Sequence, residues 1–257
     1  MRKLRLAALL ASGNAAASPV VRALAAANAI GPVASTSFRV ASRIANAVRA
    51  GRAVASVEAF EDSHLILISV PAQAMASAVA QLVAAPFEWK HRTVILEGDD
   101  GACLAPLHQL GAITGVITVM PGAGGRLFLL EGERPAVREP RALLGRTVQL
   151  VLIPPGARAR FDAGLTFAGH ALFPLLAAAD AAFATTGLHR RLTDPVLGKT
   201  VQRALRAWTN ARRKGWSTLD VPDETRIARQ IAALEHTSPR AGACLKNVLE
   251  TVNEFMR

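Results

Sequence analysis

The chain has 257 residues, 51% of them hydrophobic and 19% charged, so it can bury a sizeable core in one large domain or two smaller ones. This composition excludes an intrinsically disordered chain, which would be too polar to bury a core. The net charge of +11 favours anionic partners, namely nucleic acid, anionic lipid or phosphorylated small molecules. No acidic residue precedes Glu58. The N-terminal surplus of positive charge is therefore either a solvated basic face or a site for a phosphorylated ligand.

The two cysteines, Cys103 and Cys244, form no C-x-x-C metal or redox motif, which favours buried free thiols in a reducing cytoplasm. The N-terminus has the outline of a secretory signal, with a basic start, a short apolar stretch and small residues at 15–17. Residues 12–14 (SGN) interrupt that apolar stretch early. A first strand entering a turn accounts better for these residues, and we expect a cytoplasmic protein.

Up to residue 153, short apolar runs alternate with helix-like stretches. The expected strands span residues 4–10, 31–35, 65–70, 93–96, 113–119, 127–130 and 148–153. The expected helices between them span residues 15–29, 40–50, 74–83 and 103–110. Such alternation with short links predicts an α/β fold with a mainly parallel sheet and right-handed crossovers. The run 65–70 (LILISV) is continuously apolar, as expected for the buried middle of a parallel sheet.

Pro154-Pro155-Gly156 marks a boundary. The pattern beyond it predicts helices only, at residues 158–183, 195–209, 224–234 and 240–256. We therefore expect an α/β domain over residues 1–154 and an all-α domain over residues 155–257.

The apolar stretch 163–179 reaches only the lower length limit of a membrane span, and it contains His170 and Pro174. A core or dimer-forming helix is the favoured interpretation. A helix that is apolar on all sides must be buried, and a small helical domain cannot easily hide it alone. We expect a homodimer through the C-terminal helices and no membrane contact.

The stretch 11–16 (ASGNAA) follows the first apolar run, where a dinucleotide-binding protein carries G-x-G-x-x-G. The middle glycine, Gly13, is retained, and the third position accepts Ala16, but the first position is Ala11. A helix N-terminus after a strand can bind an anion through free N–H groups, and Ser12 and Asn14 could add hydrogen bonds. The alternative is an ordinary strand-to-helix turn, which also requires glycine and small residues.

Residues 35–39 (STSFR) follow the second expected strand and contain no acid to hold the ribose hydroxyls of NAD. Thr36 and Arg39 instead suit a 2′-phosphate, and so NADP; the alternative is a solvated loop with a helix cap at Ser37. Val70 and Pro71 end the strand 65–70 and place backbone at the carboxyl edge of the sheet, beside the expected ribose.

The order of these features resembles a bacterial family of Rossmann-like proteins with a helical C-terminal dimerisation domain. The resemblance rests on the degenerate glycine turn, on SVPAQAM (69–75) and LAPLHQLGA (104–112), on the PG after Met120, and on the apolar helix 158–183. Such proteins are similar in architecture to pyrroline-5-carboxylate reductase, ketopantoate reductase and 6-phosphogluconate dehydrogenase. The resemblance implies an NADP site and oxidoreductase activity.

The chain departs from the family pattern at several polar positions. Alanine follows Val70-Pro71 where the family has Asp, residues 97–101 (EGDDG) replace a His-Cys/Thr-Ser-Gly segment, and Met120-Pro121 replaces His-Pro. The family's His near Asp162 and its Ser-Asn near Gly169-His170 are also missing. Asp223 matches the Asp of an RGD-like segment, but Val221 and Pro222 precede it. These replacements argue against catalysis more than against the fold.

No histidine spacing typical of a metal site, no G-x-S-x-G elbow and no P-loop sequence occurs. His170 is either a core histidine or a proton donor to substrate. Glu97, Asp99 and Asp100 either orient a cation or water or form a solvated acidic loop. The basic and aromatic stretch 201–216 permits nucleic-acid binding, although cations at a helix end, or cations that reach a ligand, are simpler explanations.

These observations predict a Rossmann-like dinucleotide-binding domain over residues 1–154 and a helical substrate and dimerisation domain over residues 155–257. The expected function is an NADP-dependent oxidoreductase acting on a small molecule. Ser12, Gly13 and Asn14 would hold the pyrophosphate, Thr36 and Arg39 the 2′-phosphate, and His170 would transfer a proton. The alternative is a non-catalytic ligand-binding or scaffolding dimer that keeps the fold.

Overall fold

The computed structural model describes residues 6–86, 88–98, 100–120, 124–145, 148–212, 214–215, 219 and 224–256. The chain divides into two compact units, Met1–Arg160 and Phe161–Arg257. The division therefore falls six residues after the position 154 predicted from the sequence, near the start of a helix rather than at the Pro-Pro-Gly stretch.

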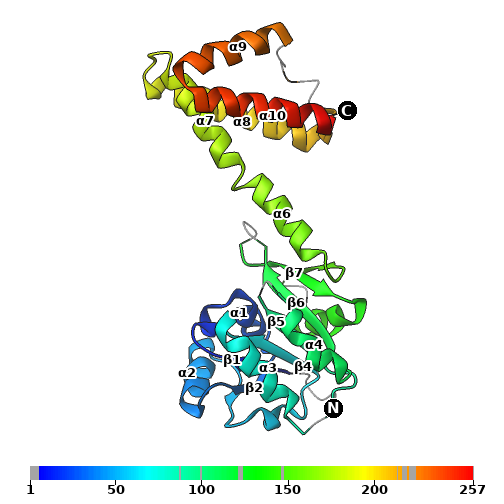
Figure 1. Ribbon diagram of the computed structural model, residues 1–257. Coiled ribbons are helices and arrows are strands. Elements are labelled where there is room, and N and C mark those ends of the chain that lie inside the picture. The colour runs from blue at the N-terminus through cyan, green and yellow to red at the C-terminus, as the bar shows by residue number, and fades with distance from the viewer. Residues whose placement is uncertain are drawn as a thin grey trace. The chain divides into compact units, whose positions relative to one another are not determined.

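The strands described in the first unit form one eight-stranded sheet in the order β3-β2-β1-β4-β5-β6-β7-β8 (Figure 1). The strands are β1 (Ala7–Ala11), β2 (Ile30–Ala34), β3 (Arg52–Ala53), β4 (Leu65–Ser69), β5 (Thr93–Glu97), β6 (Ile113–Val119), β7 (Leu127–Gly132) and β8 (Gln149–Ile153). Strands β1 to β6 are parallel, β7 runs antiparallel to β6, and β8 runs parallel to β7. The predicted mainly parallel α/β sheet is confirmed.

Strands β1 and β4 lie at the centre, where the order of the strands reverses. From β1 the chain adds β2 and β3 on one side, and from β4 it adds β5 and β6 on the other. The two central strands pair in parallel from Ala7↔Leu65 to Ala11↔Ser69, so both end at the same edge of the sheet. Ligands of open α/β sheets bind outside the carboxyl ends of the strands at such a reversal.

Helices cover both faces of this sheet. These are α1 (Pro19–Ala26), α2 (Phe38–Val48), α3 (Met75–Val83), α4 (Ala105–Gln109) and α5 (Arg138–Leu144). Leu9, Leu67 and Ile95 belong to a buried cluster with α1, α2 and α5, whereas the alternate residues Leu10 and Ile66 belong to a second cluster with α3 and α4. Because both faces are buried, the strands are apolar at every position rather than at every second one.

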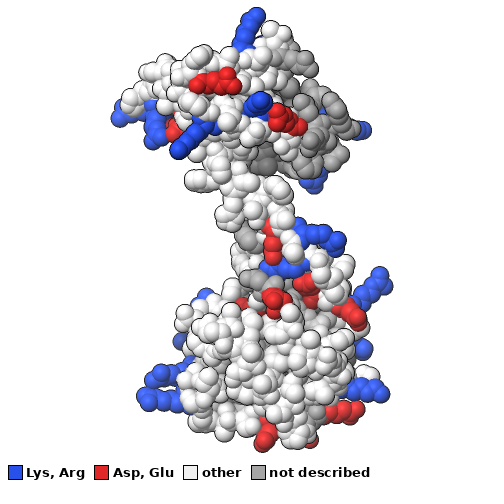
Figure 2. All heavy atoms as spheres, in the orientation of Figure 1, with Lys and Arg blue, Asp and Glu red and all other residues white. Residues whose placement is uncertain are grey.

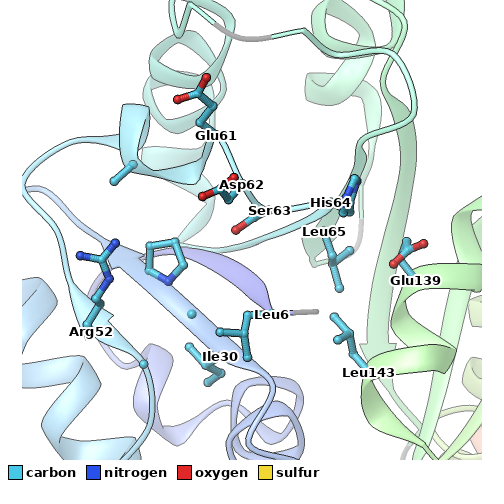
Figure 3. Close-up of a pocket in the computed structure, with 14 residues that line it drawn as sticks. Leu6, Ile30, Arg52, Glu61, Asp62, Ser63, His64, Leu65, Glu139 and Leu143 are labelled. Carbon is cyan, nitrogen blue, oxygen red and sulfur yellow. The ribbon is translucent and has the colours of Figure 1, made fainter. Parts of the chain in front are cut away.

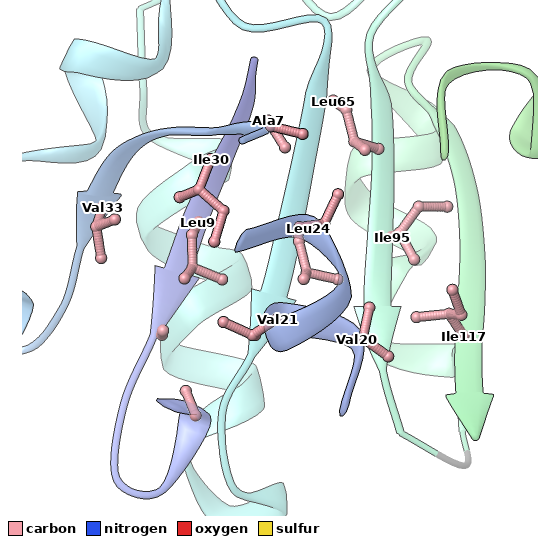
Figure 4. Close-up of a cluster of buried hydrophobic side chains, with 14 of the residues drawn as sticks. Ala7, Leu9, Val20, Val21, Leu24, Ile30, Val33, Leu65, Ile95 and Ile117 are labelled. Atoms are coloured by element: carbon pink, nitrogen blue, oxygen red, sulfur yellow. The ribbon is translucent and has the colours of Figure 1, made fainter. Parts of the chain in front are cut away.

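Helix α1 shows how the first cluster is built (Figure 4). Its apolar residues Val20, Val21 and Leu24 are almost fully buried and point toward the strands. Pro19 stands at the first position, where its missing N–H costs nothing, and the Ser18 side chain accepts a hydrogen bond from the Val21 N–H at 3.1 Å. The start of α1 is thus fixed beside the carboxyl end of β1.

The second unit is helical throughout its described part, as predicted. Its helices are α6 (Arg158–Ala168), which begins just before the division, α7 (Leu172–Ala184), α8 (Arg190–Ala211), α9 (Glu224–Thr237) and α10 (Pro239–Met256). Helix α10 packs against α9 and α7, and α7 packs against α8 (Figure 1). The prediction of one helix over residues 158–183 is wrong at its middle, because a turn at 169–171 separates α6 from α7.

Arg92 joins two loops at the amino edge of the sheet. One guanidinium nitrogen, Nη1, donates to the carbonyl oxygens of Phe60 at 3.2 Å and Ser63 at 2.8 Å, and Nη2 donates to the Glu61 carbonyl oxygen at 2.7 Å. Nε donates to the Glu88 carbonyl oxygen. Burial lowers the pKa of Arg92, and the nearby Glu61, Asp62 and Glu88 carboxylates oppose that shift. The planar fork of arginine suits several carbonyl acceptors at once.

We predict that Arg92→Met destabilises the protein by about 2–3 kcal/mol, because several carbonyl groups lose a charged donor. Chemical denaturation monitored by circular dichroism measures the change. The matched control is Arg141→Met at an exposed position of α5, which should alter stability by less than about 0.5 kcal/mol. Equal stability of the two variants would contradict a structural role for Arg92.

Candidate functional site

The turn after β1 carries the predicted pyrophosphate residues. Gly13 has φ +58°, a left-handed conformation that favours glycine, and a Cβ added there would lie 3.7 Å from Cγ of Pro71. Neither the Gly13 nor the Asn14 backbone N–H has an acceptor within the described part of the chain. Ser12 is half-buried, and its N–H donates to the Ser69 carbonyl oxygen at 3.2 Å. The turn therefore presents two unused N–H groups, the kind of donors that bind an anion.

A small pocket of about 220 Å³ opens beside this turn. It is lined by residues at the ends of β1, β4 and β5 and the start of α1, namely Ser12, Asn14, Ala15, Ser18, Ser69, Val70, Pro71 and Glu97. Four predicted site residues, Ser12, Asn14, Val70 and Pro71, thus meet in one place although the sequence separates them by more than fifty positions. The parallel register of β1 with β4 brings them together.

Thr36 and Arg39 lie at the same edge but outside that pocket. Strand β2 pairs with β1 up to Leu10↔Ala34, so the segment after β2 begins beside the Gly13 turn. Both side chains are exposed. Ser37 caps α2 by accepting a hydrogen bond from the Val40 N–H at 3.3 Å, as the solvated-loop interpretation proposed. The side chains of Thr36 and Arg39 take no part in this cap.

Glu97 also lines this pocket, although the sequence left open that it belongs to a solvated acidic loop. Its Oε1 accepts a hydrogen bond from the Ser18 hydroxyl at 2.5 Å, and its Oε2 accepts one from the Ser69 hydroxyl at 2.6 Å. The side chain is half-buried. Glu97 is therefore a fixed group of the pocket and not part of a solvated loop. Asp100 differs, because it is exposed and accepts a hydrogen bond from the Ala102 N–H at 2.8 Å.

Both cysteines are free and half-buried rather than fully buried. Cys103 lies just beyond the carboxyl end of β5, between Asp100 and α4. Burial, and to a smaller degree the Asp100 carboxylate, raises the pKa of the Cys103 thiol. A raised pKa reduces the thiolate fraction at neutral pH, which makes Cys103 a poor nucleophile.

His170 belongs to the second unit and is exposed in the turn between α6 and α7. Its role in proton transfer stays a prediction. Within the described ranges, no group of three His, Cys, Asp or Glu side chains could hold a metal ion. Five residues named in the sequence analysis lie outside the described residues, namely Asp99, Pro121, Val221, Pro222 and Asp223.

A larger cavity of about 680 Å³ lies at the opposite edge of the sheet (Figure 3). Its lining comes from the amino ends of β2 and β4, including Ile30 and Leu65, and from the segment that precedes β4, including Asp62 and His64. Leu6, the first described residue, also lines it. Because ligands of parallel sheets bind at the carboxyl ends of the strands, this cavity is not the expected nucleotide site.

The positive charge does not form one stripe on the face seen in Figure 2, where Lys and Arg side chains occupy separate positions and Asp and Glu lie among them. Arg212 of the basic stretch 201–216 lies 5.9 Å from the ring centroid of Trp208, a contact within the helix end itself. This contact explains one pair of neighbouring basic and aromatic residues in the stretch, and nucleic-acid binding is not needed to explain that pair.

Solved structures resemble the whole chain. A Bacteroides fragilis protein provisionally named an NADP oxidoreductase has a TM-score of 0.76 at 14% identity, with 97% of this chain and 98% of that chain covered. An imine reductase from Aspergillus terreus, in complex with NADPH4 and dibenz[c,e]azepine, has a TM-score of 0.67 at 14% identity. The match covers 99% of this chain and 93% of that chain. An imine reductase from Myxococcus stipitatus, in complex with NADP⁺, has a TM-score of 0.63 at 14% identity. The match covers 96% of this chain and 94% of that chain.

The chain shares the fold of NADP oxidoreductases and imine reductases. This confirms the predicted architecture, a Rossmann-like domain followed by a helical domain. No protein-family model matches the chain, and no curated protein matches it. In this fold, the small pocket and the Gly13 turn lie at the carboxyl edge of the sheet, where open α/β sheets bind their ligands.

Proposed function

We propose that the protein binds NADP at the carboxyl edge of its sheet and works as an NADP-dependent oxidoreductase on a small imine or carbonyl compound. The observation that carries the proposal is the Gly13 turn, which presents unused N–H groups beside a pocket at the reversal of strand order. The similar structures that hold NADPH4 or NADP⁺ support the choice of cofactor.

The residues of this edge fit such a cofactor. Gly13 and Asn14 would donate backbone N–H groups to the pyrophosphate, and Ser12 would add its hydroxyl. Thr36 and Arg39 would bind the 2′-phosphate, since both are exposed and no carboxylate follows β2. The Ser35 hydroxyl at the end of β2 is buried without a partner among the described residues, so this segment has unused hydrogen-bonding capacity.

NADPH, when bound, supplies the hydride, and the protein positions the reacting groups. Val70 and Pro71 form the pocket wall beside β4, and they would limit the access of water to the ribose side of the cofactor. His170 stays the proposed proton donor, because the ring nitrogens of a histidine can both donate and accept a proton.

We also propose that the working form is a homodimer through the second unit. Phe167 on α6 and Phe173 on α7 are 75% and 76% exposed in the single chain, and Leu172 and Leu175 are also exposed. The stretch 158–184 contains an 18-residue segment with a mean hydropathy of 1.4, none of which is buried, and the stretch is long enough to cross a membrane. The turn at 169–171 divides it into two helices, each shorter than the roughly 20 residues that cross a bilayer. Contact with a second copy would cover this surface.

The dimer predicts a mass of twice 27.1 kDa in solution. The double variant Phe167→Glu and Phe173→Glu should be monomeric, because burying two carboxylates in an apolar interface is costly. Size-exclusion chromatography with light scattering measures the mass. Leu110→Glu, which alters an exposed apolar residue of the first unit, is the matched control and should stay dimeric. A monomeric wild-type protein would overturn the proposal.

Titration calorimetry with NADPH tests the cofactor site directly. We expect micromolar binding to the wild-type protein and a loss of at least about tenfold in Gly13→Asp, which places a carboxylate and a strained φ at the phosphate turn. Gly111→Asp is the control, since Gly111 also has a positive φ, with open space around it, but lies at the amino edge of the sheet. It should bind NADPH as the wild type does.

The choice of NADP over NAD depends on Arg39 in this proposal. Arg39→Glu should weaken NADPH binding by about tenfold or more and leave NADH binding nearly unchanged, because a charged hydrogen bond to the 2′-phosphate is lost. Arg134→Glu, an equal charge change at an exposed position next to β7, separates this effect from the change in net charge. Equal weakening of both cofactors by Arg39→Glu would rule out a 2′-phosphate contact.

A non-catalytic ligand-binding dimer is the second candidate. The Glu97 carboxylate in the pocket favours it, because a fixed negative charge opposes the binding of a pyrophosphate nearby. Absence of binding of both NADPH and NADH to folded, dimeric protein would select this candidate.

A further inference from the structure

The position of Glu97 in the fold determines which part of the cofactor it would meet. A dinucleotide fold consists of two mononucleotide-binding halves that meet where the strand order reverses. The half formed by β1, β2 and β3 carries the Gly13 turn and the Thr36–Arg39 segment, which would hold the phosphates and the adenosine side. Glu97 ends β5 in the other half, which is left for the nicotinamide side.

Two anchors hold the Glu97 carboxylate in place. Ser69, whose residue exposure is only 7%, donates to one oxygen from the end of β4. Ser18 donates to the other oxygen and is itself the cap of α1. Distances of 2.5 and 2.6 Å place both hydroxyl groups within hydrogen-bond range of the carboxylate oxygens. The side chain cannot turn away without breaking both hydrogen bonds.

The charge of Glu97 has no counter-ion in the described part of the chain. Its hydrogen-bond partners are two neutral hydroxyl groups, and no Lys or Arg among the described residues pairs with it. Because the group is half-buried, solvent screens it less than it would screen a surface carboxylate. An unpaired negative charge in such a place favours a cation and disfavours an anion.

We propose that Glu97 makes this pocket select the oxidised, cationic nicotinamide over the reduced, neutral one, an inference that rests on the proposed NADP site. The two forms of the cofactor share their phosphates and differ in charge at the nicotinamide ring alone. Repulsion between Glu97 and the phosphates acts on both forms alike and cancels in the ratio of their dissociation constants. Attraction to the ring acts on the oxidised form only.

The test compares dissociation constants of NADP⁺ and NADPH for wild type and Glu97→Gln by titration calorimetry at one salt concentration. Glutamine keeps the shape of the side chain and removes its charge. We expect the preference for NADP⁺ to fall by about threefold to tenfold in Glu97→Gln, the range for unit charges several ångströms apart in a partly buried site. Glu97→Asp retains the charge and should retain most of the preference.

Glu133→Gln is the matched control, because Glu133 is exposed and follows β7 at the amino edge of the sheet. It should leave the ratio unchanged. If both forms bind and Glu97→Gln has the wild-type ratio, the inference is overturned while the NADP site stands. If the folded wild-type protein binds neither form, both the NADP site and this inference are overturned.

A second variant keeps the test decisive if Glu97→Gln does not fold. Ser69→Ala removes one anchor of the carboxylate and leaves its charge. The released side chain should lower the preference for NADP⁺ in the same direction by a smaller factor. An unchanged ratio in a folded Ser69→Ala protein, together with loss of folding in Glu97→Gln, would assign Glu97 to stability instead of cofactor selection.

Discussion

The parallel pairing of β1 with β4 is the constraint on which the rest of the first unit depends. It aligns Ala11 with Ser69 and thereby places the Gly13 turn beside Pro71. Each neighbouring strand then extends this central pair outward, with helices packed on both faces. The pocket exists because two strands far apart in the sequence end side by side at the place where the strand order reverses. A shift of one residue in this register would exchange the two faces of β1 and move Ala11 out of line with Ser69.

Much of this fold follows from the sequence, because its signals are local and strong. The run 65–70 forms β4, which ends one residue earlier at Ser69, and the run 113–119 forms β6 with the predicted bounds. Strand β3 was missed, since it has only two residues, Arg52 and Ala53, and no apolar run. The expected helix 15–29 divides into a short 3-10 helix and α1, because Ser18 caps α1 and Pro19 lacks the N–H that would continue the earlier helix.

The candidate site could be predicted only where a motif sits on a turn. The sequence singles out Ser12, Asn14, Val70 and Pro71 from their place after apolar runs, and the structure brings them to one pocket, while their role in cofactor binding stays a prediction. Glu97 was not found as a fixed group, because its partners Ser18 and Ser69 are 79 and 28 residues away in the sequence. In the sequence, Glu97 stands next to Gly98 and two aspartates, which is typical of a solvated loop. Only the strand order brings Ser18 and Ser69 beside it. The break in the long apolar helix likewise depends on a turn at 169–171 that hydrophobic periodicity does not show.

In the proposed NADP site, the hydrogen bonds that fix Glu97 would link the packing of the sheet to the energetics of the bound cofactor. By thermodynamic linkage, a site that holds the oxidised form more tightly than the reduced form lowers the reduction potential of the bound couple below that of the free couple. Bound NADPH then becomes a stronger hydride donor than NADPH in solution. A carboxylate anchored between a strand end and a helix cap would thus set the driving force of reduction, without touching the substrate at all.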